Sequence, residues 1–215
     1  MKKNRIGNIR KDYVVDQLNR KDLAENPIEQ FRRWFEEVLQ SDLAEPNAMA
    51  LATASASGIP SLRMVLLKSF DENGFVFFTN YDSRKGRALA ENPNAALLFW
   101  WGFLERQIRI EGRVEKISPD ESDAYFQERP RDSQLGAWAS QQSRSLDDRI
   151  ILENRFSKYA QEFAGKSIER PQYWGGFRVI PQRVEFWQGR ASRLHDRFVY
   201  LNESGKLWRI ERQFP

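Results

Sequence analysis

The chain has 215 residues, of which 40% are hydrophobic, and this is enough to build one substantial domain or two small ones. It contains no cysteine, which excludes disulfides, thiolate nucleophiles and cysteine metal sites, and which fits a reducing compartment. No stretch approaches the roughly 20 apolar residues of a membrane span, and the basic start precedes no apolar run of the signal-peptide kind. We therefore expect a cytoplasmic protein.

The charge balance is basic, with 34 basic against 30 acidic residues, a net charge of +4 and a pI near 9.4. Such a balance is compatible with a nucleic-acid partner, bound by a basic barrel through its surface aromatics in a salt-dependent manner. Basic and acidic residues alternate along most of the chain, however, which favours a solvated surface of mixed charge and no nucleic-acid partner.

The N-terminal segment, residues 1–25, is polar and charged, and we expect an arm that is either loose or draped over a folded body. The body is predicted to be a single domain over residues 26–215. Its first element is a helix that Asn26 can cap, with Pro27 at the first position and Glu29 completing a capping-box pattern. The apolar residues at helical spacing are Ile28, Phe31, Trp34, Phe35, Val38 and Leu39.

Short runs rich in Val, Leu and Phe follow and predict antiparallel strands joined by tight turns. The strands are expected at 48–55, 62–70, 75–80, 95–101, 106–117 and 177–188, with a final hairpin over 196–212 turned at Glu203 to Gly205. Helices are expected at 83–91, from 118 to just before Pro130, and at about 147–163. This pattern predicts the α+β class with mainly antiparallel β structure, arranged as a barrel with peripheral helices.

Several standard sites are excluded by counting residues. One histidine and no cysteine make a zinc site improbable, and we expect no metal. The glycines form neither GxGxxG nor GxxxxGK, and no GxSxG accompanies the histidine. If the chain is an enzyme, a bound cofactor is therefore expected to carry the chemistry.

The segment SRKG combines a helix cap with two cations. Ser83 can cap the helix, while Arg84 and Lys85 lie in its first turn, where the helix dipole disfavours cations and favours anions. A bound phosphate explains this arrangement. A solvated surface turn is the alternative.

Arg63 and Lys68 flank the apolar strand interior of RMVLLK. Alternation places them on opposite faces, so either a bulge intervenes or they serve different groups. Each residue taken singly also fits a strand edge with its charged end in solvent.

The segment ERPRDSQ carries Arg129, Arg131 and Ser133 shortly after Tyr125. Planar guanidinium donors at a corner fixed by Pro130 match a phosphate dianion. The alternative is a helix end capped by arginine.

In SRLHDR, the residues Arg193, His195 and Arg197 would share one face if the segment is extended, with Asp196 on the other. An anionic ligand against that face would offset their repulsion, and His195 alone among the side chains titrates near neutral pH. The alternative is a structural histidine.

The chain resembles the pyridoxine 5′-phosphate oxidases of the FMN-binding split-barrel group over nearly its whole length. The motifs that carry the resemblance are RMVLLK at 63–68, FFTN at 77–80, SRKG at 83–86, ERQIRIEG at 105–112, RPRDSQLGAW at 129–138, QQS at 141–143, YWGGFRV at 173–179 and EFWQGRASRLHDR at 185–197. Eight motifs in the family's order are specific. The fold that the resemblance implies is an FMN-binding split β-barrel.

The resemblance implies a homodimer with FMN at the subunit interface. It also implies oxidation of pyridoxine or pyridoxamine 5′-phosphate by oxygen to pyridoxal 5′-phosphate, with hydrogen peroxide. Residues implied to hold FMN are Arg63, Met64, Val65, Leu66, Leu67, Lys68, Phe78, Thr79, Arg84, Lys85, Gln107, Gln142, Ser143, Trp187 and Arg197. Residues implied to bind substrate are Lys68, Tyr125, Arg129 and Ser133 at the phosphate, Arg193, Leu194 and His195 at the pyridine end, and Arg10 and Tyr13 from the arm.

Among these residues, the resemblance implies catalytic roles for Arg193 and His195. A rival within the same fold is an FMN-binding protein that lacks oxidase activity. Such a protein would keep the phosphate site at Ser83 to Lys85 but would have no reason to keep both RPRDSQ and SRLHDR.

Overall fold

The structure is a computed structural model that describes residues 11–205 and 207–215. The chain divides into two compact units, each assembled from segments that are distant in sequence. The first unit takes in the described parts of Met1–Pro46 and Gln182–Pro215 together with Leu97–Ile110, and the second takes in Asn47–Ala96 and Glu111–Pro181. A single domain over residues 26–215 stays a prediction.

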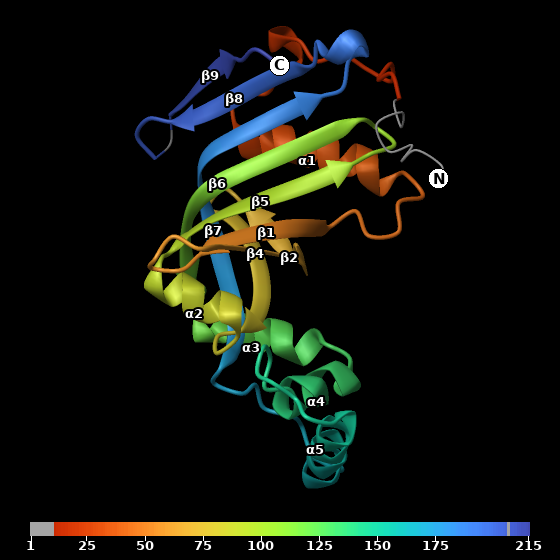
Figure 1. Cartoon of the computed structure of the whole chain (residues 1–215), viewed down its shortest axis with the longest axis vertical. Helices are drawn as coiled ribbons and strands as arrows, with labels where there is room; N and C mark the ends of the chain where they lie inside the picture. Colours follow the sequence, from red (N-terminus) through yellow and green to blue (C-terminus); the bar gives the residue numbers. More distant parts are fainter. Residues whose placement is uncertain (1–10, 206) are drawn as a thin grey trace, which may run out of the picture. The chain divides into compact units, whose positions relative to one another are not determined.

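The described residues form a sheet of nine strands in the order β2-β1-β5-β6-β7-β4-β3, with β8 paired to β7 and β9 paired to β8 (Figure 1). The pairs β1–β2, β3–β4, β4–β7, β7–β8 and β8–β9 are antiparallel, as the short runs and turns predict. The strands are β1 (Ala48–Ala54), β2 (Pro60–Leu66), β3 (Ser69–Asp71), β4 (Gly74–Asn80), β5 (Asn94–Trp101), β6 (Arg106–Lys116), β7 (Trp174–Gln188), β8 (Asp196–Asn202) and β9 (Trp208–Arg212).

The helices in the described part of the chain are α1 (Pro27–Leu39), α2 (Arg84–Glu91), α3 (Pro119–Glu128), α4 (Arg131–Ala139) and α5 (Arg149–Glu162), with 3-10 turns η2 (Arg20–Asp22) and η3 (Ala191–Arg193). Asn26 caps α1, Ser83 caps α2 and Asp148 caps α5 through their side chains. None of these helices has the length and apolar content needed to cross a bilayer.

Helix α4 is an element that the sequence analysis does not predict. It begins directly after Pro130, whose carbonyl accepts the N–H groups of Ser133 and Gln134, at 2.8 and 3.1 Å. Pro130 therefore ends one helix and starts the next. The glycine at position 136 and the polar residues around it hide this second helix in the sequence.

The core of the first unit lies between α1 and the strands beside it. Phe31 and Val38 are fully buried, and Trp34 packs edge-on against Phe186 with ring centroids 5.2 Å apart. The segment before α1 contributes to this core, because Leu18 is buried and the Tyr200 hydroxyl donates to the Ala24 carbonyl at 2.7 Å. The buried residues of α1 follow the predicted spacing, although Leu39 is 58% exposed.

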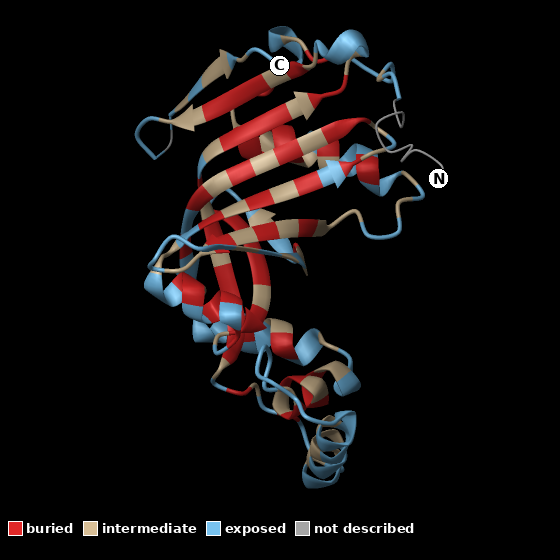
Figure 2. Cartoon of the chain, viewed as in Figure 1, coloured by how far each residue is buried: buried red, intermediate tan, exposed pale blue. Residues whose placement is uncertain are grey.

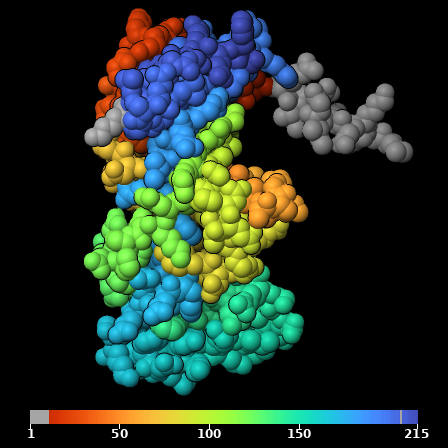
Figure 3. Space-filling view, turned by 90° about the vertical axis from the view of Figure 1, so that its left-hand side faces the viewer, coloured from red at the N-terminus to blue at the C-terminus, as the bar shows by residue number. Residues whose placement is uncertain are grey.

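The second unit surrounds strand β4, which is buried along almost its whole length (Figure 2). Gly74 opens this strand at a φ of 134°, and a Cβ there would come within 2.1 Å of the Val179 carbonyl oxygen, so only glycine fits. A smaller apolar cluster of this unit gathers Phe126, Leu135 and Trp174. Helix α5 has no buried residue and lies at the surface in the space-filling view, in teal (Figure 3).

Candidate functional site

The second unit contains a cavity of about 1020 Å³, which reaches the upper end of the size range of small-molecule sites, roughly 300–1,000 Å³. We call it the basic cavity. It is built from β2, β4, the start of α2, the corner between α3 and α4, and the loop after α4. The predicted residues that line it are Arg63, Met64, Val65, Leu66, Lys68, Phe78, Thr79, Arg84, Lys85, Tyr125, Arg129, Ser133, Gln142 and Ser143.

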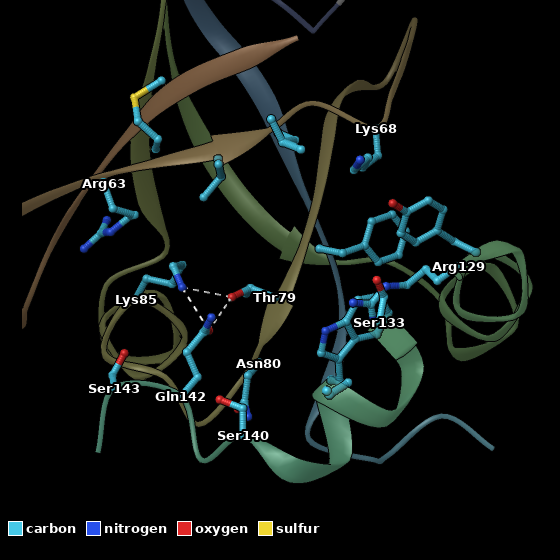
Figure 4. Close-up of a pocket in the computed structure, with 18 of the residues that line it drawn as sticks. Arg63, Lys68, Thr79, Asn80, Lys85, Arg129, Ser133, Ser140, Gln142 and Ser143 are labelled. Atoms are coloured by element: carbon cyan, nitrogen blue, oxygen red, sulfur yellow. Dashed lines mark hydrogen bonds between the residues drawn. The ribbon is translucent and has the colours of Figure 1, made fainter. Parts of the chain in front are cut away.

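Lys85 is the most buried cation of this cavity, with 9% exposure. Its ammonium donates to Thr79 Oγ1 at 3.0 Å, to Gln142 Oε1 at 3.1 Å and to Ser83 Oγ at 3.4 Å, all of which are uncharged (Figure 4). Burial, together with the nearby charge of Arg63, lowers the pKa of Lys85 to about 8. A buried cation surrounded only by dipoles is a site for an anion.

Arg63 lies beside Lys85 on the same side of the basic cavity (Figure 4). Its guanidinium donates to the Leu51 carbonyl and Thr53 Oγ1, both at 2.9 Å, and to Ser61 Oγ at 2.7 Å. Burial and the charge of Arg84 lower its pKa. Three cations therefore converge near the start of α2, where the helix dipole also favours an anion.

A second basic group lies on the other side of the cavity and contains Arg129 and Lys68 (Figure 4). The Arg129 guanidinium lies 4.5 Å from the Trp174 ring centre, and its Nη1 is buried without a hydrogen-bond partner among the described residues. Burial lowers the pKa of Arg129. A stacked guanidinium with an unused donor is prepared for an anionic ligand.

Aromatic rings form the wall next to this second group. Phe78 and Tyr125 stack with centroids 4.0 Å apart, and Phe78 stacks on Trp174 at 5.3 Å. The Lys68 ammonium lies 6.0 Å from the centre of the Tyr125 ring. The Arg129 guanidinium packs over Trp174, one of these rings, and the residue lines the cavity beside them.

The structure resolves the alternation problem of Arg63 and Lys68. The predicted strand 62–70 is divided, since β2 ends at Leu66 and β3 begins at Ser69. At the break the Lys68 N–H donates to the Val76 carbonyl at 2.9 Å. Both cations therefore line one cavity, at two different groups, while Leu67 turns away from the cavity and is buried.

Arg131 behaves differently from its neighbour Arg129. Its guanidinium donates to the carbonyls of Lys166 and Phe163, at 3.0 and 2.6 Å, and it does not line the basic cavity. The two arginines of RPR thus differ in their contacts. Arg129 lines the cavity, whereas Arg131 binds carbonyls at and after the end of α5.

The first unit gathers a separate group of predicted residues around His195. The imidazole lies 4.6 Å from the Trp187 ring and 5.6 Å from the Tyr13 ring, measured between centroids. Its Nδ1 accepts the Arg190 N–H at 3.1 Å, so the neutral ring carries its proton on Nε2. Burial and the charge of Arg193 lower the pKa of His195, against an opposing effect of Asp196.

The extended arrangement expected for SRLHDR is not what the structure shows. Ser192 and Arg193 have φ values of 56° and 62°, in the left-handed region, and β8 begins only at Asp196. The three basic residues therefore do not alternate along one strand face. Arg197 is bound to a carboxylate within this unit, that of Glu185, with Nε and Nη2 at 2.9 and 3.0 Å from its two oxygens.

The other predicted residues take varied positions. Gln107 is half-buried on β6, and Leu194 is 69% exposed. Arg10 lies outside the described residues.

Three residues around these sites were not assigned from the sequence. Trp174 supports Arg129, Glu105 is buried beside the arm, and Glu185 binds Arg197. Each falls in a motif that carries the resemblance, YWGG, ERQIRIEG or EFWQ. Because basic and acidic residues alternate along the chain, nothing in the sequence separates these two buried glutamates from exposed ones.

Glu185 is 1% exposed and faces three guanidinium groups, those of Arg197, Arg183 and Arg109. Burial alone would raise its pKa, but hydrogen bonds and charges from these arginines lower it. Glu185→Gln is therefore expected to reduce the free energy of unfolding by about 3 kcal/mol, because it removes the buried negative charge that these three guanidinium groups share. Urea unfolding at pH 7 measures this value.

The control for this substitution is Glu153→Gln, which removes a surface partner of Arg149 and is expected to change stability by at most about 0.5 kcal/mol. The carboxylate's contribution is present above its unfolded pKa, near 4.3, and is lost as the pH falls through its lower folded pKa. The stability difference between the wild type and Glu185→Gln should therefore shrink in acid. A constant difference down to pH 2 would contradict this reading.

Comparison with known proteins places the chain in a family. Residues 35–163 match the model of the family described as pyridoxamine 5′-phosphate oxidase. Residues 174–215 match the model of the pyridoxine 5′-phosphate oxidase C-terminal dimerisation region.

Curated relatives match nearly the full length. The pyridoxine/pyridoxamine 5′-phosphate oxidase of Trichormus variabilis is 55% identical over 210 residues, which is 98% of each chain. That of Cupriavidus pinatubonensis is 56% identical over 98% of this chain and 99% of its own.

Solved structures also match this chain over most of its length. PhzG from Burkholderia lata, in complex with tetrahydrophenazine-1-carboxylic acid, is 32% identical with a TM-score of 0.87 over 94% of this chain and 99% of its own. A pyridoxamine 5′-phosphate oxidase-related, FMN binding protein from Nostoc punctiforme is 19% identical with a TM-score of 0.69 over 90% and 100%, and shares the fold. The fold is thus the split barrel with peripheral helices, and the chain belongs to the pyridoxine/pyridoxamine 5′-phosphate oxidase family.

Proposed function

We infer that this chain oxidises pyridoxine 5′-phosphate and pyridoxamine 5′-phosphate to pyridoxal 5′-phosphate, with oxygen as the electron acceptor. Hydrogen peroxide is the second product, and with the amine, water hydrolyses the imine formed by oxidation so that ammonia is released. The observation that carries this assignment is the pair of cationic groups in one cavity, Arg63 with Arg84 and Lys85 on one side and Lys68 with Arg129 on the other. Two groups match two phosphates, that of the cofactor and that of the substrate.

FMN is the cofactor that suits the first group. Its phosphate would pair with Arg63, Arg84 and Lys85, and the rest of the molecule would contact the β2 residues Met64 to Leu66, the β4 residues Phe78 and Thr79, and Gln142 and Ser143 of the loop. The buried Lys85, with uncharged partners and a lowered pKa, supports this fit. Bound FMN would supply the acceptor for a hydride from the substrate carbon, with oxygen as the final electron acceptor.

Lys68, Tyr125, Arg129 and Ser133 anchor the substrate phosphate far from the reacting carbon, so that binding energy aligns the ring. Arg193 and His195 hold the reacting end. Because His195 Nδ1 accepts a backbone N–H, its Nε2–H is the group that donates to the substrate. Trp187, Gln107 and Arg197 complete the contacts with the cofactor, and Tyr13 and Arg10 cover the substrate.

The assembly proposed is a homodimer with FMN between the subunits. The match of residues 174–215 to a dimerisation region supports it. Exposed apolar side chains on β2, Leu62 and Met64, at 69% and 64% exposure, provide surface that a second subunit would cover. We propose a cytoplasmic location, and this proposal rests on the amino-acid composition alone.

A second candidate is an FMN-binding relative with another substrate, since PhzG has the same fold and was solved with a phosphate-free tricyclic acid. The cluster of Arg129 and Lys68 beside stacked aromatics favours a phosphorylated substrate, because two cations that line the same part of the cavity match a phosphate dianion. The phosphate is therefore the feature that separates the two candidates.

The test is to purify the protein, record its visible spectrum, and add pyridoxine 5′-phosphate in air while following peroxide and the aldehyde product. A yellow protein that makes both products supports the assignment. A yellow protein inert toward both vitamers would point to the second candidate. A colourless protein that FMN cannot restore would overturn the cofactor and the reaction together.

The cofactor site predicts a proton linkage at Lys85. In the FMN-free protein, Lys85 is charged below a pKa of about 8 and neutral above it, so FMN affinity should fall as the pH rises through this value. A phosphate dianion raises the pKa again, so binding near pH 8.5 should take up a proton. Calorimetry in two buffers of different ionisation enthalpy measures this uptake.

Lys85→Met is expected to abolish the proton uptake and to weaken FMN binding roughly 30-fold or more. Arg87→Met is the control, because Arg87 lies exposed on the same helix, donates to the Asp82 carbonyl and does not line the basic cavity. Proton uptake that persists in Lys85→Met would assign the linkage to another group.

A further inference from the structure

Glu105 is a carboxylate with no solvent exposure, in the turn just before β6 in the first unit. Its Oε2 accepts the Val15 N–H at 3.0 Å, and its Oε1 forms an ion pair with the Lys11 ammonium at 3.2 Å. Both partners belong to the N-terminal arm. Burial alone would raise the pKa of Glu105, but the bond from Val15 and the charge of Lys11 lower it, so the residue stays ionised.

The backbone of Glu105 is unusual as well. Its φ is 55°, in the left-handed region that is unfavourable for a non-glycine residue. Its carbonyl accepts the Gly189 N–H at 2.7 Å, and the next N–H, that of Arg190, donates to His195 Nδ1. Glu105 thus binds the arm through its side chain and the segment leading to His195 through its backbone.

The arm and this segment are in close contact at Gly189. A Cβ at Gly189 would come within 2.7 Å of Tyr13 Cγ and 3.0 Å of Glu105 Cβ, so the three residues pack without spare room. Tyr13 in turn lies edge-on to Trp187 and His195, with centroids 5.7 and 5.6 Å away. The position of the Tyr13 ring over His195 therefore depends on what holds the arm.

We propose that Glu105 is a positioning residue whose carboxylate holds residues 11–15 in place, so that the Tyr13 ring covers His195. A second contact holds the arm, since Arg106 binds Asp16 at 2.9 Å. That contact is shared, because Arg106 also binds Glu37 and Gln188. Glu105 has no solvent exposure, and both the hydrogen bond and the ion pair of its carboxylate are made with the arm.

The test uses the fact that His195 is the only histidine of the chain, so that one imidazole signal reports on it in an NMR titration of the FMN-loaded protein. Burial contributes to the lowered pKa of His195, and the Tyr13 ring is part of that burial. Tyr13→Ala should shift the titration upward, toward the ordinary value of about 6.5. Glu105→Gln should shift it in the same direction, and the double variant should add little to Tyr13→Ala.

Trypsin cleavage after Lys11 gives a second readout, which should be roughly tenfold faster in Glu105→Gln than in the wild type. Glu37→Gln is the matched control, because it removes a carboxylate from Arg106 without touching the arm. It should change neither readout. The proposal is overturned if Glu105→Gln leaves the His195 titration at its wild-type position, or if its shift adds in full to that of Tyr13→Ala.

The consequence for turnover rests on the proposed function. If Tyr13 covers the substrate, Glu105→Gln should raise the Michaelis constant several-fold, and the Tyr13→Ala background should remove this effect. An inactive wild-type protein would defeat the oxidase assignment and leave the titration and cleavage results to decide the role of Glu105.

Discussion

Arg129→Ala is expected to raise the KM for pyridoxine 5′-phosphate about 50-fold while changing kcat little. The guanidinium stacks on Trp174 at 4.5 Å and keeps a buried, unused donor, so it has the geometry to bind a phosphate oxygen. Charge-assisted hydrogen bonds of this kind contribute roughly 1.5–3 kcal/mol, and each 1.4 kcal/mol is tenfold in affinity. Since the phosphate is remote from the reacting carbon, the loss falls on binding. Steady-state kinetics with peroxide detection measures both constants.

The matched control is Arg131→Ala. Arg131 is two residues away in the same RPR motif, but it binds the carbonyls of Lys166 and Phe163 outside the basic cavity. Its KM should stay within about twofold of the wild type. Pyridoxine without its phosphate supplies a further control, because Arg129→Ala should not alter the use of a compound that lacks the group Arg129 is proposed to bind. A loss of kcat at unchanged KM would instead indicate that Arg129 acts in the chemical step and does not anchor the substrate phosphate.

Local features of the sequence were sufficient to predict the helix start at which the first anion group is proposed. The cap at Ser83 and the cations Arg84 and Lys85 lie within one turn of helix, so their arrangement follows from helix geometry alone. The hairpins and capped helices were predicted on the same basis. The structure confirms β4, α2 and α3 within one or two residues.

Features that depend on distant contacts could not be predicted from the residues alone. The division of the predicted strand 62–70 at Leu67 places Lys68 in the basic cavity, and this break is held by the Val76 carbonyl of another strand. The motif resemblance named Lys68 as a ligand without giving this reason. Helix α4 was missed because Pro130 ends one helix and caps the next.

The sequence analysis also did not identify two buried carboxylates, those of Glu105 and Glu185. Glu105, in the turn before β6, and Glu185, in β7, are almost fully buried, yet the chain around them alternates acidic and basic residues, as a solvated edge does. Their burial is possible only because Lys11 and Val15 from the arm, and Arg197 from β8, satisfy them. Such pairing joins segments that are about 90 and 12 residues apart in the chain, which a linear pattern does not reveal.

Arg193→Ala is expected to lower kcat by about 100-fold with a smaller change in KM. Arg193 holds a left-handed φ of 62° in the turn before His195, a strained conformation for an exposed arginine and one that is common at functional sites. In the proposed role it aligns the reacting end of the ring, and loss of alignment reduces the rate of the chemical step. Steady-state kinetics of the purified variant provides the two constants.

The same variant has a spectroscopic signature that does not depend on turnover. The Arg193 charge helps to lower the pKa of His195, so Arg193→Ala should shift the single histidine titration upward, while Arg193→Lys should keep it near the wild-type value. Arg209→Ala, which removes an equal charge from β9 next to Glu203, should change neither kcat nor the titration. If Arg193→Ala shifts the titration but leaves kcat intact, Arg193 is an electrostatic neighbour of His195 and has no part in aligning the substrate. If kcat falls about 100-fold in Arg193→Lys as well, the planar guanidinium is what the reaction requires, because the charge alone is retained in that variant.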